Sequence, residues 1–230
     1  MKTIGLLGGM SWESTQGYYR AINEGVKEAL GGLHSAKLVL NSVDFAEIEA
    51  CQQSGDWRKA GEILAQAAQG VEAAGADCLL ICTNTMHKVA EDIDDAISIP
   101  LIHIADATGE ALKQAGVKRV GLLGTAFTME QDFYKGRLSE QHDLEVLIPK
   151  AEDRALIHRV IFQELCVGIT TNASKAEYLR IIEALKEQGA EAVILGCTEI
   201  GMLVTQADTD TPLFDTTEIH ADAAVTFALK

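Results

Sequence analysis

The chain resembles itself at a shift of 112 to 116 residues, and this internal duplication limits the folds that it can adopt. Residues 4–8 (IGLLG) match residues 120–124 (VGLLG), and residues 75–81 (GADCLLI) match residues 189–195 (GAEAVIL). Residues 99–102 (IPLI) resemble residues 211–214 (TPLF). The repeat predicts that one folding unit occurs twice, with equivalent strands at equivalent positions.

Each half alternates short apolar runs with segments of helical period, which is the pattern of a parallel α/β sheet. Apolar residues between Trp57 and Val71 lie three or four apart, as on one face of a helix, and Gly75 follows where such a helix would end. The predicted strands are 4–7, 38–40, 78–81, 101–104, 120–123, 144–148, 192–195 and 213–214.

We therefore predict an α/β protein with two pseudo-symmetric, doubly wound α/β domains, each with a parallel sheet, and an interdomain cleft. In such folds the crossovers are right-handed and ligands bind beyond the carboxyl ends of the strands. Pro100 and Pro212 fall at equivalent points of the repeat, so we place the crossings between domains there. The first domain then comprises 1–99 plus 211–230, and the second comprises 100–210.

The charge balance narrows the function. The chain has 19 Lys and Arg residues against 34 Asp and Glu residues, a net charge of −15. Because nucleic acids and anionic membranes are bound by clustered basic side chains, we expect neither as a partner and expect a small molecule instead. Five cysteines, no opening typical of a signal peptide and no run of roughly 18 apolar residues predict a cytoplasmic protein with reduced thiols.

Two equivalent blocks with reactive side chains follow predicted strands. Residues 82–87 (CTNTMH) align with residues 196–201 (GCTEIG), so Thr83 is the counterpart of Cys197. We expect each block to open a helix, capped by Asn84 and Thr85 in one half and by Thr198 in the other. The free N–H groups of such a terminus bind a carboxylate and lower the pKa of a cysteine from about 8.5 toward neutrality, which predicts a thiolate at Cys197.

Other candidate side chains have simpler interpretations. His87 lies in the first turn after Asn84 and Thr85, and we interpret it as a supporting residue behind the site rather than the primary base. Cys51 and Cys166 lie in helical surroundings and are interpreted as packing residues. No metal site is predicted, since Cys78 and Cys82 have no second pair of metal ligands nearby in the sequence.

At several motifs the chain resembles the aspartate/glutamate racemase family of cofactor-independent amino-acid racemases, in particular its broad-specificity amino-acid racemase branch. The resemblance covers essentially the whole length, and the motifs are specific when they are taken together. They are residues 8–12 (GGMSW) with Tyr18-Tyr19, Asp44-Phe45 leading to Gln52, residues 82–87, Gly124-Thr125 with Thr128, and residues 196–199 (GCTE). The resemblance implies two pseudo-symmetric domains, a site in the cleft between them, a homodimer, and no pyridoxal phosphate or metal.

The resemblance also implies roles for single residues. Racemisation needs a base on one face of the substrate's α-carbon, an acid on the other, and donors for the enolate-like carboxylate that forms. Cys197 would abstract the α-proton, and Asn84, Thr85 and Thr198 would hold the α-carboxylate. The residues that would line the pocket are Met10, Gln52, Thr125, Thr128 and Glu199, with Glu164 as the reader of the distal substrate group.

The chain departs from the family at one decisive position. Most members place a cysteine directly before the Asn-Thr of the first block, but here that residue is Thr83 and Cys82 lies one place early. Adjacent side chains of a strand point to opposite faces, so Cys82 is not expected to substitute. An aliphatic hydroxyl is not ionised near pH 7, so Thr83 would at best relay a proton through water. Since the second-block cysteine of the family works on the L-isomer, we expect a preference for L-enantiomers.

Two other functions stay open at this point. One-cysteine members of the same superfamily decarboxylate or isomerise small dicarboxylates, for which a single thiol suffices. An amino-acid-binding protein whose catalytic pair has decayed would also carry Thr83, although the intact block around Cys197 disfavours it. The blocks contain no Arg or Lys as a partner for a distal carboxylate, so acidic, hydroxyl-bearing and broad substrate specificity all remain compatible with the sequence.

Overall fold

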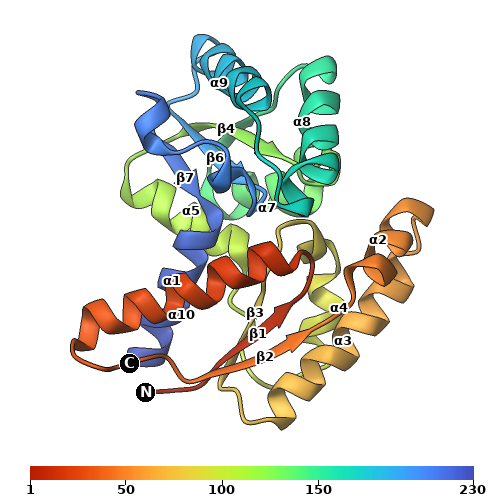
Figure 1. Ribbon diagram of the computed structural model, residues 1–230, viewed down its shortest axis with the longest axis vertical. Helices are drawn as coiled ribbons and strands as arrows, with labels where there is room; N and C mark the ends of the chain where they lie inside the picture. Colours follow the sequence, from red (N-terminus) through yellow and green to blue (C-terminus); the bar gives the residue numbers. More distant parts are fainter. The chain divides into compact units, whose positions relative to one another are not determined.

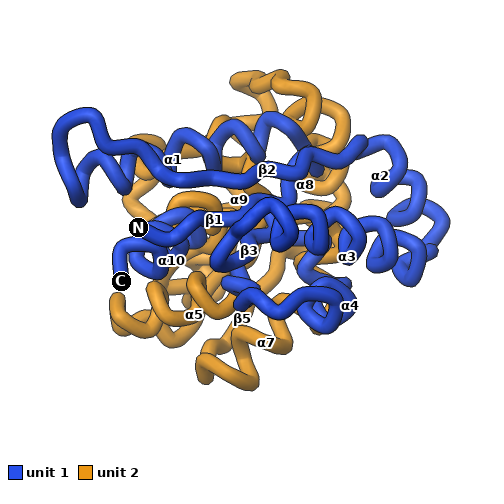
Figure 2. The backbone as a smooth tube through the Cα atoms, turned by 90° about the horizontal axis from the view of Figure 1, so that it is seen from below, with its two compact units in different colours: residues 1–104, 220–230 blue, residues 105–219 orange.

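The chain folds into two compact units in the computed structural model, which describes residues 1–230. Unit 1 comprises Met1–Ile104 and His220–Lys230, and unit 2 comprises Ala105–Ile219 (Figure 2). Both crossings lie later in the chain than the prolines at which we predicted them. The reason is strand pairing: Leu101 still bridges to Leu79 of unit 1, and residues 213–215 pair with the 192–196 strand of unit 2.

Each unit contains one parallel sheet, so the predicted α/β class with parallel sheets is confirmed. The strand order in unit 1 is β2-β1-β3 (Figure 1), and in unit 2 it is β5-β4-β6-β7. The strands are β1 (Ile4–Gly8), β2 (Leu38–Ser42), β3 (Cys78–Ile81), β4 (Arg119–Gly124), β5 (Glu145–Leu147), β6 (Ala192–Gly196) and β7 (Leu213–Asp215).

The register of the two sheets repeats the sequence duplication. Ile4 of β1 lies opposite Cys78 of β3, and the equivalent Val120 of β4 lies opposite Ala192 of β6. The Pro100 carbonyl accepts a hydrogen bond from the Leu79 N–H at 3.0 Å, just as the Pro212 carbonyl accepts one from the Val193 N–H at 2.8 Å. The two prolines therefore occupy equivalent places beside the third strand of each sheet.

The predicted strand at 101–104 is wrong beyond its first residue. Leu101 forms an isolated bridge, and helix α5 (Ile104–Gln114) starts shortly afterwards. The Ile102 carbonyl accepts a hydrogen bond from His220 Nε2 at 2.6 Å, and the Ile104 N–H donates to His87 Nε2 at 3.2 Å. Because these main-chain groups bond side chains, they do not extend the ladder.

Helices cover both faces of the unit 1 sheet. Leu79 and Ile81 pack with the apolar residues of α2, α3 and α4, whereas Leu6 and Leu80 pack with those of α1 and α10. Alternate residues of a strand point to opposite faces, which is why continuously apolar strands carry a helical layer on each side.

Besides α5, the α-helices of the whole chain are α1 (Trp12–Leu30), α2 (Phe45–Ser54), α3 (Trp57–Ala73), α4 (Ala90–Asp94), α6 (Ala126–Glu130), α7 (Asp132–His142), α8 (Ala151–Gln163), α9 (Asn172–Glu187) and α10 (Thr216–Leu229).

Side-chain caps and glycines set the helix ends in unit 1. The Ser11 side chain accepts a hydrogen bond from the Ser14 N–H at the start of α1, and Asp44 and Asp56 cap α2 and α3 in the same way. Helix α3 confirms the helix predicted from Trp57, and Gly75 beyond its end has a φ of +92°, a conformation that favours glycine.

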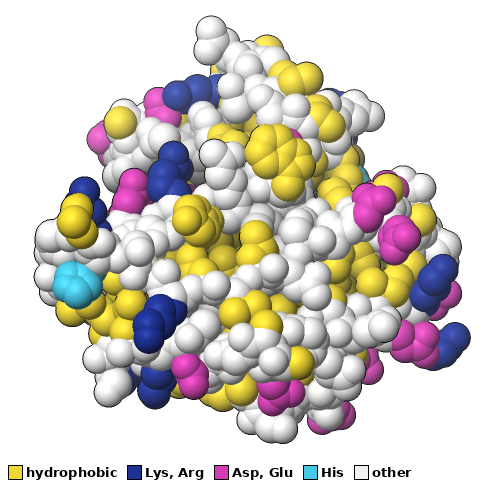
Figure 3. All heavy atoms as spheres, turned by 60° about the horizontal axis from the view of Figure 1, so that its bottom comes forward, with side chains coloured by type: hydrophobic (Ala, Val, Ile, Leu, Met, Phe, Trp, Pro, Cys, Tyr) yellow, Lys and Arg dark blue, Asp and Glu magenta, His cyan; other side chains and the backbone are white.

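The surface and the thiols are simply described. On the face shown in Figure 3, charged side chains of both signs are dispersed among apolar and uncharged ones. All five cysteines are free thiols. None of the helices is both long enough and apolar enough to span a membrane.

Candidate functional site

In unit 1 the motif residues gather at the carboxyl ends of the neighbouring strands β1 and β3. The Ser14 hydroxyl donates to the Cys82 carbonyl at 2.9 Å, which ties the start of α1 to the block after β3. Gly9 has a φ of +94°, and a Cβ atom there would collide with the Val43 carbonyl oxygen. Gly9 is thus required by backbone geometry, because the chain passes too close to Val43 for a side chain, whereas a Cβ atom on Gly8 would meet the Thr15 side chain.

Gln52 joins the same end of unit 1. Its Nε2 donates to the Met86 sulfur at 3.1 Å, so helix α2 contacts the 82–87 block directly. Gln52, Met10 and Met86 are all buried. The structure therefore brings together the unit 1 residues that the sequence singled out, although they are spread over some 80 positions of the chain.

The two neighbours Cys82 and Thr83 lie in different environments. Cys82 is fully buried in the apolar cluster beneath α1 and α10, and burial raises the pKa of its thiol far above the ordinary range. A thiol held neutral inside the core cannot replace the first-block cysteine, whose position Thr83 occupies. Thr83, whose relative exposure is 9%, follows Cys82 outside that cluster.

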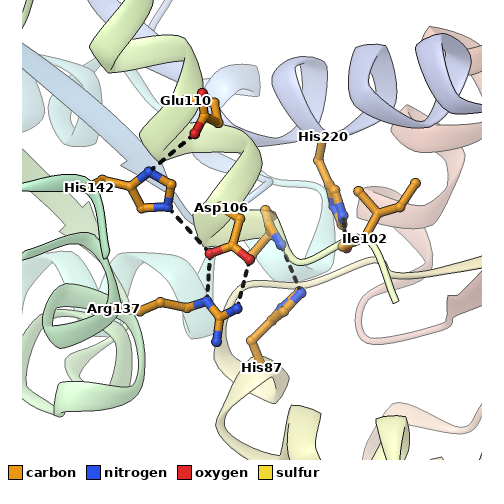
Figure 4. A network of polar contacts seen from close by, with 8 residues as sticks. His87, Ile102, Asp106, Glu110, Arg137, His142 and His220 are labelled. Atoms are coloured by element: carbon orange, nitrogen blue, oxygen red, sulfur yellow. Dashed lines mark hydrogen bonds and ion pairs between the residues drawn. The ribbon is translucent and has the colours of Figure 1, made fainter. Parts of the chain in front are cut away.

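His87 bonds two stretches of main chain, and Figure 4 shows the bond to the segment that leads into α5. Its Nδ1 lies 2.8 Å from the Thr83 carbonyl oxygen, and its Nε2 accepts the hydrogen bond from the Ile104 N–H. A carbonyl only accepts and an N–H only donates, so these bonds define a neutral imidazole with its proton on Nδ1. In this form His87 holds the backbone of Thr83 and of the segment that leads into α5.

A second buried imidazole lies beside His87. His220 Nε2 donates to the Ile102 carbonyl, and its Nδ1 lies 2.8 Å from the Tyr18 hydroxyl, which donates to it. The rings of His87 and His220 are 5.9 Å apart, and the ring of His103 is 4.5 Å from that of His87. Burial lowers the pKa of His220 to about 4, so this imidazole is neutral near pH 7.

The helices predicted after the two strands are 3₁₀ helices. They are Thr85–Val89, which runs directly into α4, and Ile200–Met202, and neither has a side-chain cap. Asn84 occupies the cap position of the first without a side-chain cap bond, and the Thr198 hydroxyl bonds a carboxylate instead. The predicted side-chain caps are therefore wrong, and a 3₁₀ turn provides less of the dipole that would lower a thiol pKa than a full α-helix does.

In unit 2 the equivalent end of the sheet is built by β4 and β6. Gly124 lies opposite Gly196, and a Cβ atom on Gly124 would come within 2.9 Å of the Gly196 carbonyl oxygen. Thr125 then caps α6, because its hydroxyl accepts from the Thr128 N–H at 3.3 Å and lies 3.2 Å from the Thr128 hydroxyl. Thr125 and Cys197 thus follow paired residues of adjacent strands.

Cys197 is paired with a buried carboxylate. Its thiol donates to Glu199 Oε2 at 2.9 Å, and the Thr198 hydroxyl donates to the same oxygen at 2.8 Å. Cys197 is 8% exposed and Glu199 is 3% exposed. Burial, and next the negative charge of Glu199, raise the pKa of Cys197 well above its ordinary value. The predicted resting thiolate is therefore wrong, and Cys197 rests as a neutral thiol.

The surroundings of this pair are acidic. Tyr178 of α9 donates its hydroxyl to the Ile157 carbonyl, and burial, together with the nearby acidic groups Cys197 and Glu164, raises its pKa far above the ordinary range. Glu164 Oε2 accepts hydrogen bonds from Ser174 at 2.7 Å and from Thr171 at 3.3 Å, at the start of α9. The carboxylate predicted to read the substrate thus also ties α8 to α9.

One contact of this cluster could not be predicted from the sequence. Cys166, in the 3₁₀ helix Leu165–Val167, is half-buried and donates to Glu199 Oε1 at 3.8 Å. The contact joins positions 33 residues apart, and no spacing or motif in the sequence points to it. No group of three or more His, Cys, Asp or Glu side chains is arranged to hold a metal ion.

Comparison with known proteins agrees with these motifs. A family model described as Asp/Glu/Hydantoin racemase matches residues 7–224. The broad-specificity amino-acid racemase RacX of Bacillus subtilis (strain 168) is 22% identical over 96% of both chains. A solved structure from Yersinia pestis, described as a candidate Asp/Glu racemase, is 54% identical with a TM-score of 0.92 and covers 100% of both chains. An aspartate racemase homologue from Pyrococcus horikoshii OT3 is 36% identical, with a TM-score of 0.86 and the same coverage. The resemblance predicted from the motifs is confirmed.

Proposed function

Because the chain belongs to the Asp/Glu/hydantoin racemase family, and is an isomerase by that membership, we propose that it racemises amino acids with the Cys197 thiol as the group that exchanges the α-proton. The observation that carries the proposal is the 2.9 Å hydrogen bond from this thiol to the Glu199 carboxylate at the carboxyl end of β6. A thiol becomes a base only after it has lost its proton, and Glu199 is placed to receive it.

The proton movements follow from this pairing. The S–H proton of Cys197 first passes to Glu199 Oε2, which leaves a thiolate and a neutral carboxylic acid. The thiolate then takes the α-proton, and the electron pair of the C–H bond moves into the substrate carboxylate. Racemisation is complete when that electron pair returns to the α-carbon and takes a proton on the opposite face, which we assign to a water that Thr83 relays; the Glu199 acid then returns its proton to solvent. Because burial raises the pKa of Cys197, little thiolate is present at rest, but the thiolate that forms is a stronger base. A stronger base suits the removal of a proton from a weakly acidic C–H bond. Hydroxyl donors at the strand ends, among them Thr125, would stabilise the charge that develops, whereas the Thr198 hydroxyl already donates to Glu199.

Isotope exchange tests the assignment of Cys197. In D₂O, incorporation of deuterium at the α-carbon of an amino acid should be lost in Cys197→Ser, because an alcohol in that place does not supply the base. Cys51→Ser removes a buried thiol of unit 1 and should leave exchange intact. Exchange that survives in a folded Cys197→Ser variant would remove this thiol from the mechanism.

We propose further that exchange is faster for L-enantiomers, since Thr83 replaces the cysteine of the first block. Deuterium should enter L-amino acids faster than D-amino acids, and Thr83→Cys should raise the rate of racemisation. Cys82→Ala deletes the neighbouring thiol, which is buried in the core, and should leave exchange unchanged. Equal exchange into both hands by the unmodified protein would contradict the proposal.

The threonine also favours a second candidate function. A single thiol suffices to decarboxylate or isomerise a small dicarboxylate, so malonates and maleate should be tested beside acidic, hydroxyl-bearing and other amino acids. Product analysis separates the two reactions. Ligand-induced thermal stabilisation without any isotope exchange would instead support an amino-acid-binding protein whose catalytic pair has decayed.

We also propose that the protein works as a cytoplasmic homodimer. Five free thiols suit a reducing compartment, where disulfides do not persist. The dimer is the expectation from family resemblance, and sedimentation of the purified protein at several concentrations measures it directly.

A further inference from the structure

The Glu199 carboxylate lies between two thiols. Its Oε2 accepts from Cys197 at 2.9 Å, and its Oε1 accepts from Cys166 at 3.8 Å. The two donors come from different parts of unit 2: Cys197 follows β6, and Cys166 belongs to the 3₁₀ helix after α8. Each oxygen of one buried carboxylate therefore has its own thiol donor.

The second thiol matters because the other donors meet only one oxygen of the carboxylate. The terminal torsion of a glutamate is broad and twofold, so donors on Oε2 alone, from Cys197 and Thr198, leave the carboxylate plane less well defined than donors on both oxygens. A donor on the far oxygen restrains that plane, because the carboxylate is then held at both of its oxygens. The restraint keeps Oε2 aimed at the Cys197 thiol.

We infer that Cys166 is a positioning residue, whose thiol holds the Glu199 carboxylate in the orientation that accepts the proton of Cys197. The inference rests on the proposed function of Cys197 and adds a residue to it. The titratable groups around Glu199 are Cys197 at the end of β6, Cys166, Glu164 at the end of α8 and Tyr178 of α9. Of these, Cys166 is the group that meets the carboxylate oxygen opposite Cys197.

A pair of substitutions separates positioning from packing. If Cys166 only fills space, the apolar Cys166→Ala variant should be tolerated at least as well as the polar Cys166→Ser. If it positions Glu199, the order is reversed, because serine keeps a donor and alanine has none. Cys51→Ala and Cys51→Ser provide the matched control at a buried cysteine of unit 1.

The experiment measures kcat and KM for racemisation across pH in the full-length variants. We expect Cys166→Ala to lower kcat roughly tenfold with KM changed by less than about twofold, as for the loss of one donor to a charged acceptor. The pH profile of its kcat should shift as well, because the Cys197 thiol has lost the correctly oriented acceptor of its proton. Cys166→Ser should restore both kcat and the profile, and the Cys51 variants should change neither.

Two readouts keep the inference open to refutation. Cys166→Ser as impaired as Cys166→Ala, or unchanged profiles in both, would overturn it. Should Cys166→Ala not fold, Cys166→Val replaces it as the variant without a donor. The pH dependence of alkylation of Cys197 by iodoacetamide, followed by mass spectrometry, needs no turnover: a profile shifted in Cys166→Ala and restored in Cys166→Ser supports the positioning even if no amino acid is racemised. In that case the proposed function fails and the role of Cys166 stands.

Discussion

Acidification should destabilise unit 1 through the buried imidazole of His220. This side chain is fully buried between the Tyr18 hydroxyl and the Ile102 carbonyl, and burial lowers its pKa to about 4 from an ordinary value of 6.5. Protonation would turn its Nδ1 into a donor that faces the donating Tyr18 hydroxyl. The folded unit therefore resists taking up a proton that the unfolded chain accepts readily.

The sign and size follow from this difference. Above pH 6.5 the imidazole is neutral in both states, and its contribution to stability is fully present. As the pH falls from 6.5 to about 4, only the unfolded chain binds the proton, and stability is lost. The lowering of the pKa from 6.5 to about 4 corresponds to roughly 3 kcal/mol, at about 1.4 kcal/mol per pKa unit.

Fluorescence-monitored urea unfolding measures the effect, because both tryptophans, Trp12 and Trp57, belong to unit 1. The free energy of unfolding is compared at about pH 7 and about pH 4.5 for the unmodified protein and for His220→Gln, which keeps a donor and an acceptor but does not titrate. The unmodified protein should lose roughly 2 to 3 kcal/mol more than the variant over this range. His34→Gln, at an exposed histidine, controls for the loss of an imidazole elsewhere.

Parallel loss of stability in the unmodified protein and in His220→Gln would refute the reasoning. The loss would then come from other groups, and the buried histidine would not be a site where folding and protonation are coupled.

Three further substitutions test other contacts. Gly9→Ala should cost unit 1 more stability than Gly55→Ala in the same fluorescence assay, because both glycines have positive φ but only the first is crowded by the backbone; equal costs would contradict the crowding. Tyr18→Phe should lower the free energy of unfolding by roughly 1 to 3 kcal/mol, because His220 Nδ1 loses its hydrogen-bond donor. Tyr19→Phe, at an exposed tyrosine, should change it by less than about 0.5 kcal/mol. Glu199→Gln should lower kcat roughly 100-fold, since an amide does not take up the thiol proton, and a loss under about twofold would exclude Glu199 as the acceptor.

Much of the fold could be predicted from the sequence because the duplication and the apolar runs are local signals. The strands beginning at Ile4, Cys78 and Ala192 are continuous apolar segments that must be buried on both faces, and a parallel α/β sheet buries them in that way. The segment after Leu101 also contains apolar residues, so the sequence predicted a longer strand there, and its early end could be seen only in the structure. Side chains distant in the sequence, His87 and His220, bind the main-chain groups that a longer strand would need.

For the candidate site, too, the sequence predicted the positions of residues, and the tertiary structure decided their chemical state. The positions of Thr83 and Cys197 at equivalent strand ends follow from the repeat, and so does the absence of a second cysteine at the first of them. The charge state of Cys197 was decided only by tertiary structure. A thiol's pKa depends on how far water is excluded and on which charges lie near it. Here those are the burial of the strand end, the Glu199 carboxylate, and Cys166 on the carboxylate's other oxygen, a contact that the order of residues along the chain does not record.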